Sequence, residues 1–193
     1  MLGYSLDEEG FIVKTQTLDV EKELAEVIRE FTIDVTEESI IRKLVSKDII
    51  EKAKDMAEVY VYLYCVENTL RNFIKIVCYK IYGDDYINKV KIPRDVRTKI
   101  ERRKKEAEKH KWLTIRGDED LFYIDIEDIG KIIQNNWEIF KDYFPDQNWI
   151  VQKIREIQDM RNPVAHNCYI GETERTLLRG YFTAILKQIA KRL

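Results

Sequence analysis

Glycine and proline, the residues that most often interrupt helices, are scarce in this sequence. The 193 residues include 7 glycines and 3 prolines, and neither type occurs between Gly10 and Gly83. A stretch of that length is difficult to fold into strands joined by tight turns and easy to fold into helices. The sequence therefore predicts a mainly α-helical protein.

Cysteines and long apolar runs are also few. The three cysteines, Cys65, Cys78 and Cys168, are odd in number and lie far apart. This pattern excludes a disulfide scaffold and a structural zinc site, and it is typical of the reducing cytoplasm, where we expect the protein. The longest apolar run, residues 59–66, is too short to cross a bilayer. The first ten residues are acidic and lack the basic start and apolar stretch of a secretion signal, so we expect no membrane contact.

The small net charge of −2 hides an uneven distribution. Residues 1–60 hold 15 acidic and 8 basic side chains, whereas residues 91–111 hold 10 basic and 4 acidic ones. The basic segment is compatible with local phosphate binding, and a solvated helix face is the simpler interpretation. We take its central cations as candidate RNA contacts: Arg102, Arg103, Lys104 and Lys105.

Apolar residues at helical spacing predict the order of elements. A helix over residues 18–31 and a short capped helix after Thr36 come first, and the longest helix is expected from Ser46 to Tyr82. Residues 113–126 break the pattern and predict a loop or a small hairpin. The other expected helices cover residues 94–112, a span from Asp125 or Asp128 to Phe144, residues 148–160, and residues 172–193 with Leu177, Leu178, Phe182, Ile185, Leu186 and Ile189 facing inward.

No linker, repeat or low-complexity tract divides the chain. We interpret it as one helical bundle over residues 46–193, preceded by an acidic, helical N-terminal extension over residues 1–45. The fold class expected from the sequence is therefore all-α.

Histidine is rare as well, which limits acid–base catalysis to His110 and His166. We expect His110 to cap a helix end or face solvent. His166 follows Arg161 and Asn162 near a proline, and these three side chains together suit metal-free cleavage of RNA. An imidazole can deprotonate the ribose 2′-hydroxyl, a guanidinium can hold the phosphate, and an amide can orient it. A salt-bridged Arg161 and a buried His166 are the structural alternative.

The position of this segment within the chain strengthens the catalytic interpretation. Arg161-Asn162-Pro163-Val164-Ala165-His166 resembles the R-N-x-x-x-H signature of the HEPN superfamily, small α-helical domains that include many ribonucleases. Residues 62–74 resemble the E-N-x-L-R helix of the HEPN branch named after a eukaryotic mRNA-surveillance endonuclease. Residues 136–140 are similar to the n-W-x-x-F segment of that branch. The similarity covers about residues 55–190 and leaves residues 1–45 outside.

The resemblance implies a HEPN-like helical bundle and a metal-independent endoribonuclease without cofactors. It makes Arg161 and His166 the catalytic pair, Asn162 a supporting residue, and Glu67 the acidic residue that orients the arginine or the histidine. Relatives usually dimerise, so that a second histidine faces the same cleft, and many act in defence or toxin–antitoxin systems with an antitoxin partner. In one branch a tyrosine lies two residues after the histidine. Tyr169 lies three residues after it, so regulation through that tyrosine is not supported here.

Several alternatives stay open. Glu67 and Arg71 are four residues apart and can form a simple ion pair on the helix surface, although Arg71 is also a candidate RNA contact. Tyr60, Tyr62 and Tyr64 cannot share one helix face, and they suit core or dimer packing better than base stacking. The alternative function is a non-catalytic HEPN-like module that binds RNA, a nucleotide or a protein.

Overall fold

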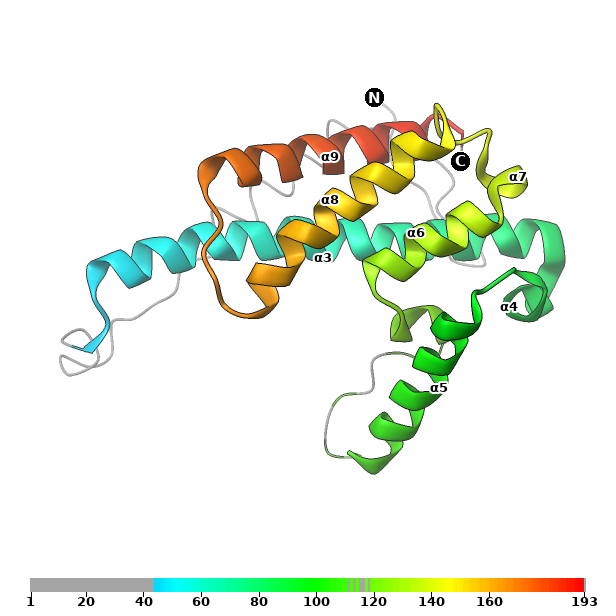
Figure 1. Ribbon diagram of the computed structural model, residues 1–193, viewed down its shortest axis with the longest axis horizontal. Coiled ribbons are helices and arrows are strands. Elements are labelled where there is room, and N and C mark those ends of the chain that lie inside the picture. Colours follow the sequence, from blue (N-terminus) through cyan, green and yellow to red (C-terminus); the bar gives the residue numbers. More distant parts are fainter. Residues whose placement is uncertain (1–43, 111, 113, 115–116, 118, 193) are drawn as a thin grey trace, which may run out of the picture. The chain divides into compact units, whose positions relative to one another are not determined.

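The computed structural model describes residues 44–110, 112, 114, 117 and 119–192, and every regular element in them is a helix (Figure 1). The all-α prediction is confirmed. The predicted extension, apart from its last two residues, lies outside the described residues. The elements are α3 (Lys47–Tyr82), η1 (Gly83–Asp85), α4 (Tyr86–Lys89), α5 (Arg94–Lys109), η2 (Asp120–Tyr123), α6 (Ile126–Asn135), α7 (Trp137–Phe140), α8 (Gln147–Ala165) and α9 (Glu172–Ala190).

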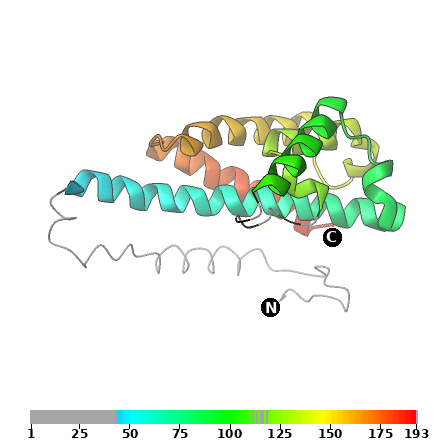
Figure 2. The same ribbon diagram turned by 90° about the horizontal axis from the view of Figure 1, so that it is seen from below.

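The longest of the described helices is α3 (Figure 2), and its bounds are the ones that the sequence predicts most closely. The hydroxyl of Ser46 accepts a hydrogen bond from the Ile49 amide at 3.4 Å, and Asp48 places a negative charge in the first turn. Gly83 then adopts a φ of +68°, a left-handed conformation that suits glycine and ends helices.

The described residues form two compact units, and both α3 and α8 contribute to each of them. The first unit holds residues 44–66 and 159–191, and the second holds residues 67–158 with Arg192.

Helices α3 and α9 pack side by side in the first unit. Contacts join Asp55 to Arg175, Glu58 to Arg179, and the ring of Tyr62 to that of Phe182, with 5.3 Å between the ring centroids. Both residue numbers rise together, so the two helices run in the same direction, as Figure 1 shows. Their buried apolar side chains are Val59, Leu63, Val66, Leu178, Phe182, Ile185 and Ile189.

The core of the second unit is built around one aromatic side chain of α3. The ring of Phe73 lies 5.6 Å from that of Phe140, 5.0 Å from Tyr143 and 5.5 Å from Phe144. On α6, Gly130 allows close approach to α8, because a Cβ there would lie 3.1 Å from Cγ2 of Ile154.

The predicted helix ending at Phe144 is wrong, since Asn136 divides it into α6 and α7. The buried amide of Asn136 donates to the Ile132 carbonyl at 2.8 Å and to the Lys91 carbonyl at 3.1 Å. Its oxygen accepts from the Lys91 amide at 2.9 Å. Helix α6 therefore ends where Asn136 bonds to Lys91, 45 residues earlier in the chain. The spacing of apolar residues near Asn136 does not predict this contact.

The other corrections concern boundaries. The described part of residues 113–126 holds the 3₁₀ turn η2 and no hairpin, and the basic helix ends at Lys109, with His110 as its C-cap. Helix α8 continues past the predicted end at Met160 and includes Pro163. On α9, which ends at Ala190, Leu177 is 45% exposed and does not face inward.

Candidate functional site

The end of α8 carries the three residues of the predicted catalytic motif. Arg161 and Asn162 lie in its last turns, and His166 follows as the first residue beyond it. The carbonyl of Pro163 accepts hydrogen bonds from the amides of His166 at 3.0 Å and Cys168 at 2.9 Å. The motif therefore occupies a helix terminus, where the chain must turn, rather than a regular helix face.

The turn after α8 is a Schellman motif. The Asn167 amide donates to the Val164 carbonyl at 3.0 Å, and Asn167 adopts a φ of +56°, which asparagine tolerates better than most residues. Together with the bond from Cys168 to Pro163, this satisfies carbonyls at the helix end and makes His166 the C-cap. The backbone of His166 is thus held by the helix, while its side chain is exposed.

The two predicted catalytic side chains differ in exposure, because His166 is exposed and Arg161 is half-buried. Within the part of the chain that the structure describes, the Arg161 guanidinium and the His166 imidazole form no ion pair and no hydrogen bond. Arg161 is half-buried and Asn162 is exposed. The contacts expected under the structural alternative, a salt bridge and a buried histidine, are therefore not seen among these residues.

The loop of residues 166–171 is also anchored at its far end. The hydroxyl of Tyr169 donates to Oδ2 of Asp55 on α3 at 2.8 Å, and Nη1 of Arg175 lies 2.5 Å from the same oxygen. This hydrogen bond to Asp55, more than burial, raises the pKa of Tyr169 above its usual range. Lys52 and Arg175 also lie 5.8 and 5.7 Å from the tyrosine ring. We call Asp55, Tyr169 and Arg175 the Asp55 cluster.

The sequence pattern does not predict the Asp55 cluster as a support for the loop that contains His166. Asp55 and Tyr169 are separated by 114 residues, so no local spacing reveals their contact. The only available signal was the nearness of Tyr169 to His166 in the chain.

Glu67 and Arg71 belong to the second unit, where they form the ion pair that their spacing predicts. Arg71 also donates to Oδ1 of Asn68 at 2.9 Å and to the Ile124 carbonyl at 2.7 Å. Arg71 therefore links α3 to the segment before α6. The orienting role of Glu67 and the RNA contact of Arg71 stay predictions.

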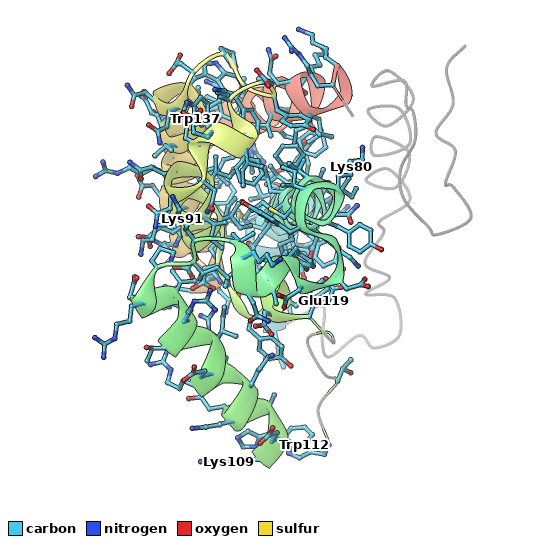
Figure 3. The ribbon with its side chains drawn as sticks, turned by 90° about the vertical axis from the view of Figure 1, so that its right-hand side faces the viewer. Lys80, Lys91, Lys109, Trp112, Glu119 and Trp137 are labelled. Carbon is cyan, nitrogen blue, oxygen red and sulfur yellow. The ribbon has the colours of Figure 1, made fainter. Side chains whose placement is uncertain are left out.

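The candidate RNA contacts on α5 fall into two groups. Arg103 donates through both terminal nitrogens to Asp125 at 2.9 Å, and Lys104 pairs with Asp120. Arg102 and Lys105 are exposed, and Arg102 lies 3.9 Å from Glu106 on the same helix. Figure 3 shows Lys109 near the far end of α5, with Trp112 beside it. Carboxylates of the same unit therefore neutralise part of the positive charge of α5.

These pairs affect the carboxylate that caps α6. Burial opposes ionisation of Asp125, but Arg103 and Lys99 outweigh it, so its pKa lies below the usual range. Asp125 and Asp128 also form the capping box at the start of α6, and Lys99 donates to Asp128 at 2.6 Å. The contacts join α5 to the start of α6.

Two of the three sequence motifs meet in the core of the second unit. Phe140, from the segment beginning at Asn136, packs on Phe73, from the segment around Glu67. Residues of these two motifs thus pack in the core, whereas the segment around Arg161 and His166 is partly exposed. Among the described residues, no three His, Cys, Asp or Glu side chains are placed to hold a metal ion. None of the described helices is long and apolar enough to span a membrane.

Comparison with known proteins agrees with the motif order. No curated protein and no solved structure matched the chain. A family model described as Swt1-like HEPN matches residues 62–189, which include all three motifs. This match covers well over half of the sequence, and the chain belongs to the Swt1-like HEPN family.

Proposed function

We propose that this protein is a metal-independent endoribonuclease in which Arg161 and His166 act on the scissile phosphate. Membership of the HEPN family supports a role in RNA cleavage or RNA binding. The observation that favours cleavage is the exposed side chain of His166, whose backbone is held at the end of α8, five residues after an arginine without a carboxylate partner in the described residues.

The reaction needs no group beyond these side chains and a second imidazole. His166 takes the proton of the ribose 2′-hydroxyl, whose oxygen attacks the neighbouring phosphorus. The bond from phosphorus to the 5′-oxygen breaks, and this oxygen takes a proton from a protonated imidazole. The products are a 2′,3′-cyclic phosphate and a 5′-hydroxyl. The guanidinium of Arg161 stabilises the charge on the phosphoryl oxygens, and the amide of Asn162 donates a further hydrogen bond.

A homodimer supplies the second imidazole in this proposal. His110, the other histidine of the chain, is the exposed C-cap of α5, far along the sequence from the motif. HEPN domains often dimerise, and a partner subunit would bring its own histidine to the same phosphodiester. As a biological setting we propose defence or a toxin–antitoxin pair, with an antitoxin as protein partner.

The test is incubation of the purified protein with RNA transcripts in the presence of EDTA. We expect cleavage with 2′,3′-cyclic phosphate ends, identified by mass spectrometry of the fragments, and a loss of about 10³-fold or more in His166→Ala. His110→Ala is the matched control and should cleave like the wild type. Cleavage that stops with EDTA, or that persists without His166, contradicts the proposal.

The second candidate is a module that binds a nucleotide, RNA or a protein without cleaving it. Its support is the pairing of Arg71, Arg103 and Lys104 with carboxylates, which leaves less cationic surface for a long RNA and favours a nucleotide or a protein as the ligand. Intact transcripts together with saturable binding of a labelled RNA, nucleotide or protein partner favour this candidate.

A further inference from the structure

Helix α3 has two contrasting faces in the first unit. Asp55, Glu58 and Tyr62 contact α9. At about 100° per residue, Tyr60 lies roughly 160° around the helix from both Glu58 and Tyr62. The face around Tyr60 therefore points away from α9.

This second face is apolar over several turns. Its residues recur at helical spacing and carry no charge: Ile49, Ala53, Met56, Tyr60 and Tyr64, which we call the Tyr60 stripe. Ile49 is 55% exposed, Tyr60 is 61% exposed and Tyr64 is 59% exposed. The stripe is about 22 Å long, at 1.5 Å of rise per residue. Ala53 and Met56, between Ile49 and Tyr60, are half-buried. Large apolar side chains exposed on one helix face over several turns are typical of a binding surface.

The chain itself contains a segment of matching length and pattern. Residues 18–31 place Val20, Leu24, Val27, Ile28 and Phe31 on one face of the helix that their spacing predicts. As a helix this segment would measure about 20 Å, nearly the length of the Tyr60 stripe.

The connection is long enough for this segment to reach the stripe. Twelve residues, 32–43, separate Phe31 from Leu44, which precedes α3. With the short helix expected after Thr36, this connection still spans about 27 Å, more than the length of the stripe. A tethered segment also has an effective concentration in the millimolar range, which favours it over a second molecule.

We propose that residues 18–31 form an amphipathic helix that packs on the Tyr60 stripe of the same chain. The extension would then be part of the first unit and would cover its exposed apolar face. This proposal does not depend on the ribonuclease activity.

Hydrogen exchange on the full-length protein tests the proposal. Backbone amides of residues 18–31 should exchange slowly in the wild type, and at least about tenfold faster in the double variant Tyr60→Asp, Tyr64→Asp. The variant Tyr60→Phe, Tyr64→Phe keeps the stripe apolar and should retain the protection. Lys80→Asp changes the charge of an exposed residue elsewhere on α3 and should also retain it.

A reciprocal variant makes the test independent of changes in α3. Val27→Asp should expose the stripe and increase nitration of Tyr60 by tetranitromethane several-fold, measured by mass spectrometry. Exchange of residues 18–31 that is fast in the wild type, or insensitive to the tyrosine changes, overturns the proposal. Protection that rises with protein concentration, together with dimer formation through the stripe, also overturns it and assigns the stripe to a second copy.

Discussion

The end of α8 and the border between α5 and α6 use similar side chains in opposite ways. On α5, Arg103 faces Asp125 and Lys104 faces Asp120, so their charges join helices of one unit. At the end of α8, Arg161 and His166 have no such carboxylate partners among the described residues. The density of basic residues along the chain therefore does not locate a binding surface. The carboxylates that fold against them decide which cations are available.

The strongest test of this contrast compares two arginines. Arg161→Lys keeps the positive charge but loses the planar fork that binds two phosphate oxygens, and we expect RNA cleavage to fall about 10²-fold. Arg103→Lys is the matched control and should leave cleavage within about twofold, because Arg103 binds Asp125. Equal losses in the two variants would remove the distinction between the regions.

The free energy of unfolding, in contrast to cleavage, should depend more on Arg103 than on the residues at the end of α8. Arg103→Met leaves Asp125 without its main partner, and we expect the free energy of unfolding to fall by about 2 kcal/mol in urea titrations near pH 7. His166→Ala removes an exposed side chain and should change this free energy by less than about 0.5 kcal/mol.

The same variant links stability to pH. The folded-state pKa of Asp125 is lowered, so its contribution is complete above its ordinary pKa near 4 and is lost as the pH falls through the lowered value. The wild type should therefore lose its advantage over Arg103→Met in acid. A difference between the two that stays constant down to about pH 2 would argue against this ion pair as the cause.

The smallest expected effect concerns the Asp55 cluster. Tyr169→Phe removes the hydrogen bond to Asp55, and we expect faster amide exchange in residues 167–170 and a loss of cleavage below about tenfold. Asp55→Asn, which also weakens the contact with Arg175, should have the larger effect of the two. Tyr60→Phe is the control on the same helix and should change neither measurement.

Local patterns predicted most of the helices and failed where distant contacts act. The bounds of α3 follow from Ser46, an uninterrupted apolar pattern and Gly83, all of which are local signals. The break at Asn136 depends on the backbone of Lys91, which no periodicity of residues 126–144 can show. The motif of Arg161 and His166 was visible because its residues lie close together in sequence.

The sequence by itself determined the all-α class and the family, because helix spacing, missing glycine and proline, and the order of three short motifs are properties of neighbouring residues. Only the tertiary structure decided which charged groups are paired with an opposite charge and which are available to a ligand. Asp125 and Asp120 reach the cations of α5 from later segments, and Asp55 reaches Tyr169 across 114 residues. Electrostatic and hydrogen-bond partners are set by distance in space, and folding alone brings such distant groups together.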